Sequence, residues 1–219
     1  MAKAETSTER RSRGRPQLRS DDETRGIIYD AARHEFAANG YAATSTEMVA
    51  RRAGVSTKTL YRLIPTKTAL FEDMVAGRLD QLSLDITLSA SHDADIEAAL
   101  NTALMACAAV SLDPDVIALQ RIVLQEASQF SDIAATFYRN GVKRLIAALA
   151  GWLRVEIKRG RLKLDDPDEA AGILIGMATS APQRAAVYGG VPLPSRAQIE
   201  RRVRTCAALF LRGCDGSRA

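Results

Sequence analysis

The sequence predicts an all-α protein, and three observations carry that prediction. Alanine and leucine dominate the composition while aromatic residues contribute only 5%, a balance that favours helices over strands. Apolar residues recur at spacings of three and four, and no segment alternates apolar with polar residues as a half-buried strand does. Residues 46–64, TEMVARRAGVSTKTLYRLI, have the pattern of two short helices joined by a tight turn.

The length indicates more than one domain. The chain has 219 residues, above the roughly 150 expected of a single domain. Residues 1–19 combine five arginines with Ser, Thr, Gly and Pro, which predicts a disordered basic arm. We expect residues 20–66 to form a three-helix domain that contains the helix-turn-helix. Residues 67–219 then form a larger helical domain, so that apolar periodicity gives about nine helices in total.

The first predicted helix has signals at both ends. Ser20 and Glu23 have the spacing of a capping box, and Gly40 is expected to end the helix, because glycine is favoured just past a helix. Thr44 and Glu47 repeat the capping-box spacing. This predicts that Thr44 caps the first helix of the helix-turn-helix.

Each residue type in the helix-turn-helix has a physical reason. Ala50 is small enough for the second helix to cross close over the first, and Gly54 suits a turn with positive φ. One face of the motif is apolar and is expected to be buried: Val49, Ala53, Val55, Leu60 and Leu63. The other face of the second helix carries short hydrogen-bonding groups and cations, which are the groups that read bases in a DNA major groove: Thr57, Lys58, Thr59 and Arg62. A plain αα-hairpin, which also uses glycine turns, is the alternative.

Caps and breakers bound the later helices. Ser56 is expected to cap the second helix of the motif and Pro65 to stop it, after which Thr66 opens a helix that runs toward Leu82. Further helical patterns cover 96–112, 116–128, 132–159, 169–187 and 195–210. In the second of these, the residues at helical spacing are Ile117, Arg121, Leu124 and Gln125.

The positive charge is confined to the N-terminal third. Residues 1–70 hold 13 Lys and Arg against 8 Asp and Glu, whereas the remainder holds 17 against 18. Nucleic-acid binding predicts such a bias, because cations neutralise phosphates. Within the basic arm, Arg13-Gly14-Arg15-Pro16 resembles an AT-hook core, whose arginines lie along a narrow minor groove. A solvated basic tail explains the same residues, and both readings stay open.

Membrane, secreted and disulfide-bonded classes find no support. No uncharged apolar run reaches about 18 residues, and the N-terminus lacks the apolar region of a secretory signal. The three cysteines, Cys107, Cys206 and Cys214, match no C-x-x-C spacing, so we expect buried thiols in a cytoplasmic protein. A redox role for Cys206 and Cys214 is the alternative.

Enzymatic chemistry also finds no support. His34 and His92 are far apart and belong to no metal-ligand motif, and no nucleophile elbow, P-loop or dinucleotide-binding glycine pattern occurs. Asp165 and Asp166 form a carboxylate pair, but they precede Pro167, where acidic groups favour the start of a helix. We therefore expect no catalytic site, no metal and no cofactor.

These residues resemble the DNA-binding domain of the tetracycline-repressor (TetR) family. The segments that carry the resemblance are Gly40-Tyr41, Thr44-Ser45, Val49-Ala50, Ala53-Gly54-Val55-Ser56, Leu60-Tyr61 and Lys67. The stretch from Asp113-Pro114 to Tyr188, with Gly160-Arg161-Leu162 and Leu164-Asp165-Asp166-Pro167, is similar to the ligand-binding part of AefR-like members. The resemblance implies a homodimeric one-component regulator, usually a repressor, that binds a palindromic operator and releases it when a small molecule binds the C-terminal domain.

The resemblance also implies roles for individual residues. Thr57, Lys58 and Thr59 match the start of the recognition helix, where base edges are reached. Tyr61 and Lys67 match positions that commonly contact phosphates, and Thr44 matches a contact to the DNA backbone. Two departures stand out in this sequence, because Lys58 replaces a frequent glycine and Ile64 replaces a usual phenylalanine.

The larger domain offers candidates for a ligand pocket and for a dimer interface. Six apolar or amphipathic residues are candidate pocket residues, with plain core packing as the alternative for each: Met105, Gln125, Phe137, Tyr138, Trp152 and Met177. We expect a lipophilic or aromatic ligand. The last two helices are expected to form the dimer interface through small residues at 170–178 and an apolar stripe from Ile199 to Phe210, unless that stripe packs within its own subunit.

Two other functions stay open at this point. In one, the DNA-binding domain compacts or coats DNA without an operator, which predicts steep salt dependence and little sequence discrimination. In the other, residues 46–64 merely pack in a helical module that binds no DNA.

Overall fold

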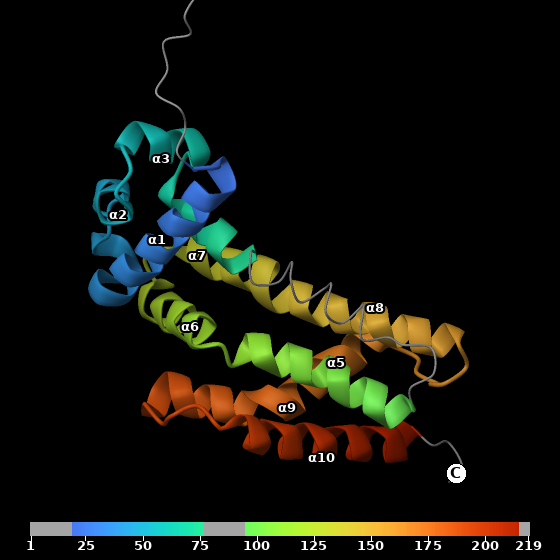
Figure 1. Cartoon of the computed structure of the whole chain (residues 1–219). Helices are drawn as coiled ribbons and strands as arrows, with labels where there is room; N and C mark the ends of the chain where they lie inside the picture. The colour runs from blue at the N-terminus through green and yellow to red at the C-terminus, as the bar shows by residue number, and fades with distance from the viewer. Residues whose placement is uncertain (1–18, 77–94, 215–219) are drawn as a thin grey trace, which may run out of the picture.

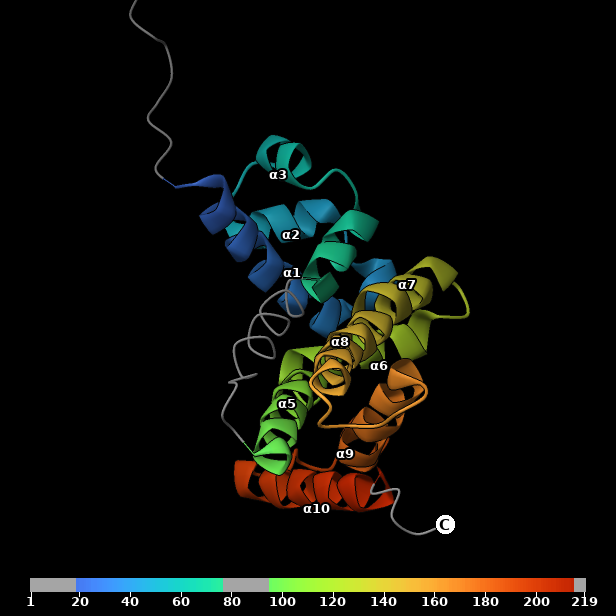
Figure 2. The same ribbon diagram turned by 90° about the vertical axis from the view of Figure 1, so that its right-hand side faces the viewer.

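The computed structural model describes residues 19–76 and 95–214, and all regular structure in these ranges is helical. Figures 1 and 2 show an elongated molecule in which α1, α2 and α3 form one end and α10 lies across the other. The all-α prediction is thus confirmed for the described residues. Within them, no single helix has the length and apolar character to cross a membrane; only α5 and α6 taken together, bent by 54° at their junction, meet that test of length and composition.

The first helix, α1 (Asp21–Ala43), begins at the predicted capping box. The Ser20 hydroxyl accepts a hydrogen bond from the Glu23 backbone N–H, and the Glu23 carboxylate accepts one from the Ser20 N–H. At the other end Gly40 has φ of +78°, which a side chain disfavours. The helix kinks there and continues to Ala43, so Gly40 bends the helix rather than ending it as predicted.

The second helix, α2 (Thr46–Ala53), is capped by Ser45, whose hydroxyl accepts from the Met48 N–H. The prediction that Thr44 caps this helix is therefore wrong. The Thr44 side chain is buried, and its hydroxyl donates to the carbonyl oxygens of Glu35 and Gly40 in α1. An inward-facing threonine fixes the chain at the α1 kink and leaves the cap to its neighbour.

The turn and the third helix, α3 (Thr57–Leu63), follow the prediction closely. Gly54 has φ of +65°, and the Ser56 hydroxyl accepts from the Thr59 N–H. Helix α3 ends before Pro65, and Thr66 caps a further helical segment at 67–76 through the Ala69 N–H. The predicted continuation toward Leu82 lies outside the described residues.

The remaining helices are α5 (Ile96–Ser111), α6 (Pro114–Glu126), α7 (Ser131–Thr136), the π-helical segment η1 (Phe137–Lys143), α8 (Arg144–Lys158), α9 (Pro167–Gly189) and α10 (Arg196–Cys214). The predicted long helix over 132–159 is present as α7, η1 and α8 in succession. A π-helical turn widens it in the middle, a feature that often marks functional positions.

The predicted face of α6 needs correction. Its buried residues are Ile117, Leu119, Ile122 and Val123. Leu124 and Gln125 are exposed instead. Of the four residues at helical spacing in the sequence, only Ile117 is buried. The buried side of α6 therefore runs through other positions, and α6 packs on α1.

Two apolar clusters hold the described helices together. One joins α1, α2, α3 and residues 70–75 to α6 and α7, and its largest side chains include Phe36, Phe71 and Leu60. The other joins α5, α8, α9 and α10. The boundary at residue 66 stays a prediction, but the first cluster continues across it into the 67–76 segment and α6. The end of the molecule that contains α1, α2 and α3 is therefore packed directly on α6 and α7.

Candidate nucleic-acid interface and ligand cavity

Helix α3 presents its predicted reading face to solvent. Lys58, Tyr61 and Arg62 are exposed, and Thr57 and Thr59 are partly exposed. The opposite side of α3 is anchored by Leu60 and Leu63, which are buried against α1 and α2. Five predicted contact residues thus lie together on one short, rigidly held helix at the end of the molecule (Figure 1).

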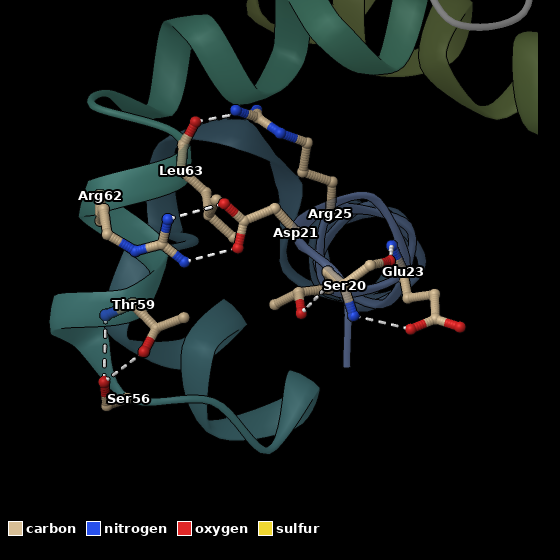
Figure 3. A network of polar contacts seen from close by, with 9 residues as sticks. Ser20, Asp21, Glu23, Arg25, Ser56, Thr59, Arg62 and Leu63 are labelled. Atoms are coloured by element: carbon tan, nitrogen blue, oxygen red, sulfur yellow. Dashed lines mark hydrogen bonds and ion pairs between the residues drawn. The ribbon is translucent and has the colours of Figure 1, made fainter. Parts of the chain in front are cut away.

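Arg62 is held by an acidic group from another helix. Its two guanidinium NH groups donate to the two carboxylate oxygens of Asp21, each at 2.8 Å, so the pair is bidentate (Figure 3). This hydrogen bond raises the pKa of Arg62. Nearby, Arg25 donates to the Leu63 carbonyl at 2.9 Å, which ties α1 to the end of α3. The start of α1 therefore fixes the orientation of the recognition helix.

Tyr61 is held in a similar way from α2. Its hydroxyl lies 2.7 Å from the Thr46 hydroxyl and donates to the Glu47 carboxylate at 3.2 Å. Hydrogen bonds from the Glu47 backbone, Ser45 and Tyr61 lower the pKa of Glu47, so the carboxylate stays ionised. The Tyr61 hydroxyl, which is predicted to contact a phosphate, is thus already bonded within the protein.

Lys67 faces inward. Its ammonium donates to the backbone carbonyls of Tyr41, Ala42 and Thr44 at 2.8, 3.4 and 3.0 Å, and it lies 4.4 Å from the centre of the Tyr41 ring. Burial lowers the pKa of Lys67, and the charge of Glu126 partly offsets this effect. The ammonium thus satisfies carbonyls at the end of α1, a place where cations are favoured.

The other predicted DNA contacts divide into two kinds. The Thr44 side chain is buried beneath α2, so its hydroxyl stabilises the interior of the motif and is not on the reading face. Arg13 and Arg15 lie outside the described residues.

An apolar cavity of about 90 Å³ lies between the two clusters. Its lining residues come from the 67–76 segment, α5, α6, η1, α8 and α9: Met74, Val75, Val110, Ser111, Val116, Leu119, Gln120, Phe137, Gly141, Val142, Leu145 and Gln183. Gly141 of η1 lies beside the 67–76 segment, where a Cβ would be 3.4 Å from the Val75 side chain, at van der Waals distance. Gln183 donates to the Ser111 carbonyl at 3.1 Å and so links α9 to the end of α5.

Of the six predicted pocket residues, only Phe137 lines this cavity. Trp152 is buried in the α5–α8–α9–α10 cluster, Met105 packs against that cluster, and Gln125 and Tyr138 are exposed. Met177 lines a separate shallow groove between α9 and α10. The six predicted pocket residues therefore lie in different places and do not line one cavity.

Much of the apolar stripe on α10 packs within its own chain, which was the alternative to a dimer interface. Val203 and Cys206 are buried, and Ile199 and Phe210 pack against the same chain's α5–α8–α9–α10 cluster. Large side chains that stay exposed on these two helices include Ile173 of α9 and Leu209 of α10, at 50% and 56% exposure, and Tyr188 near the end of α9. Leu209 is one of the residues that line the groove with Met177.

The sequence matches two family descriptions. Residues 28–74 match the bacterial regulatory proteins of the tetR family, and residues 98–213 match the C-terminal domain of AefR-like transcriptional repressors. No curated protein matches the sequence.

Solved structures are similar over nearly the whole chain. A putative TetR-family transcriptional regulator from Mesorhizobium loti is 27% identical with a TM-score of 0.77, and the match covers 89% of this chain and 98% of that one. The flavonoid-responsive regulator FrrA is 28% identical with a TM-score of 0.72, covering 90% and 100%. A TetR-family regulator from Pseudomonas syringae is 26% identical with a TM-score of 0.65, covering 87% and 96%.

The order of the helices, the exposed recognition helix and the two family matches agree with one another. The C-terminal match alone spans more than half of the chain. The protein therefore belongs to the TetR family of transcriptional regulators, which are not enzymes.

Proposed function

We propose that the protein is a cytoplasmic one-component repressor that binds a palindromic operator as a homodimer and releases it when a small molecule enters the cavity. The exposed face of α3 supports the DNA-binding part. Lys58 can donate to guanine O6 and N7, and the threonines beside it can bond to either partner of a base pair. A basic N-terminal third adds attraction for phosphates.

The observation that carries the proposal is how the cavity is connected to α1. Met74 and Val75 of the 67–76 segment line the cavity. The same segment begins with Lys67, which bonds to carbonyls at the end of α1. Any ligand that displaces the segment therefore also acts on the joint between α1 and α2.

Helix α6 provides a second connection between the same two places. Val116, Leu119 and Gln120 line the cavity. At the other end of α6, Glu126 accepts a hydrogen bond from the Ala42 N–H at 3.4 Å, and its oxygen would lie 2.9 Å from a Cβ at Gly40. The glycine is what allows this close approach. Two elements thus connect the cavity lining to the end of α1, and the proposed coupling requires that they adopt a second arrangement when a ligand binds.

Exposed Ile173 and Leu209 support a dimer through α9 and α10. Burying them against a second copy removes apolar surface from water. The recognition helix lies at the opposite end of the molecule (Figure 2), and a two-fold axis through α9 and α10 presents two reading helices to one duplex. Operator half-sites are then expected one helical turn or a multiple of it apart.

The test of DNA binding is fluorescence anisotropy on the intergenic duplex beside the protein's own gene, with a scrambled duplex for comparison. We expect the intergenic duplex to bind at least 1,000-fold more tightly. Lys58→Ala should reduce this ratio, because it removes a base contact. Lys163→Ala, an exposed lysine in the loop before α9, is the matched control and should leave the ratio unchanged. Equal binding of both duplexes, with steep salt dependence, would instead support coating of DNA without an operator.

A further inference from the structure

Among the described residues that line the cavity, Gln120 carries a buried polar atom without a partner. The side-chain oxygen of Gln120 is buried and accepts no hydrogen bond within the described part of the chain. An amide removed from water without a partner costs free energy, so such an atom on a residue that lines a cavity calls for an explanation. The other amide in the lining, Gln183, is already bonded to the Ser111 carbonyl.

We propose that Gln120 is the ligand-recognition residue, and that the ligand is a neutral molecule that carries a hydroxyl group. The inference rests on the proposed function and assigns the chemical class of its inducer. A hydroxyl both donates and accepts, so it can pair with either end of the side-chain amide of Gln120.

The lining determines the ligand's charge. None of its twelve residues is charged, and most of them are apolar. An ionised ligand group would lose its hydration there without gaining a counter-charge, which costs far more than burying a hydroxyl that finds a partner. The ligand is therefore neutral in the bound state.

The volume sets the scale of the ligand. The cavity of about 90 Å³ is smaller than an apolar cavity of about 150 Å³ that binds benzene. A single ring that enters the cavity completely must therefore move a wall. The 67–76 segment and η1 meet at Gly141 and Val75, so this wall joins the elements that lead to α1. Entry of a ring and strain at the DNA-reading end are then linked.

The experiment uses phenol and toluene, two rings of nearly equal shape that differ only in hydroxyl against methyl. Their dissociation constants are measured by chemical-shift titration on the full-length protein and on Gln120→Met, which keeps the side-chain length but removes the amide. We expect the ratio of the toluene constant to the phenol constant to fall about tenfold in Gln120→Met, because one net hydrogen bond is lost. Gln125→Met, on an exposed position of the same helix, is the matched control and should keep the wild-type ratio.

Two results would overturn the inference: a ratio that Gln120→Met leaves unchanged, or failure of both compounds to bind at the cavity. Neither result touches operator binding, which is measured separately. Conversely, Gln120-dependent phenol binding that leaves operator affinity unchanged at saturation would support the recognition role and contradict the proposed release mechanism. The two failures are therefore distinguishable.

Discussion

At the scale of single residues, the DNA-reading surface is restrained by the protein's own acidic groups. Asp21 holds the guanidinium of Arg62, and Glu47 holds the hydroxyl of Tyr61. Each carboxylate occupies donors that we expect to contact DNA. These side chains are thereby ordered before the protein meets DNA. We expect DNA binding to replace the carboxylates with groups of the DNA, which disfavours weak binding to random sequence.

Asp21→Asn tests this restraint. The substitution removes the charge that competes for Arg62, so we expect affinity for a random duplex to rise several-fold and the slope of log affinity against log salt to steepen by about one phosphate. Asp22→Asn makes the same charge change one residue away, at an exposed position of the same helix turn. Equal effects of the two variants would show that only net charge matters.

Cys107 provides a prediction for pH. Its thiol is buried between α5 and the helices that cover it, and burial raises its pKa to about 12. Because the thiolate is the reactive form, iodoacetamide at pH 9 should leave Cys107 unmodified in the folded protein and modify it in urea, as mass spectrometry can show. The folded state retains the proton more strongly, so this group's contribution to stability is complete below its unfolded pKa of about 8.5 and is lost as pH rises toward 12. Rapid modification of the folded protein would contradict the burial.

Which residues of α3 lie on its exposed face could be predicted from the sequence, but the residues that contact them from other helices could not. Thr57 and Lys58 follow a cap and precede an apolar stripe, so local spacing places them on the exposed face. Asp21 meets Arg62 across 41 residues, and no local pattern signals that contact. Lys67 was assigned to phosphate by resemblance alone, whereas its position at the end of α1 depends on the kink at Gly40.

At the scale of elements, the joint at the end of α1 collects contacts from α2, α6 and the 67–76 segment. Lys67→Met is a direct test of it. The change keeps the side-chain stem and removes the ammonium that serves three backbone carbonyls, so we expect a loss of about 1.5–3 kcal/mol in the free energy of unfolding, measured in urea. A variant as stable as wild type, with a salt slope reduced by one, would instead make Lys67 a phosphate contact.

Helix α6 shows why the cavity was mispredicted. Periodicity located α6 in the sequence but did not determine which side of the helix faces the core. Gln125, a predicted pocket residue, lies on the exposed side. Gln120 lies three residues after Ile117 and three before Val123, both of which are buried. The sequence signal for Gln120 as a cavity residue is its position as a polar residue within an apolar stripe. The π-helical turn that brings Phe137 and Gly141 to the cavity has no comparable sequence signal.

At the scale of the whole molecule, the reading helix and the proposed dimer face lie at opposite ends, joined by the helices around the cavity (Figures 1 and 2). Leu209→Glu tests the dimer. It places a charge beside the α9–α10 groove, so light scattering should show a monomer at micromolar concentration, and operator affinity should fall with it. Leu124→Glu, at a similarly exposed leucine of α6, is the control and should stay dimeric. A dimeric Leu209→Glu protein would place the interface elsewhere.

The central claim is that the state of the cavity sets the affinity for DNA, and the most direct measurement replaces the ligand with a side chain. Val110→Phe puts a ring into the cavity from α5. Operator affinity is compared with that of wild type and of Val155→Phe, a half-exposed position of α8 outside the lining. The account predicts that Val110→Phe binds the operator at least tenfold more weakly while remaining folded and dimeric, and that Val155→Phe binds normally. A folded, dimeric Val110→Phe protein with wild-type operator affinity would contradict it.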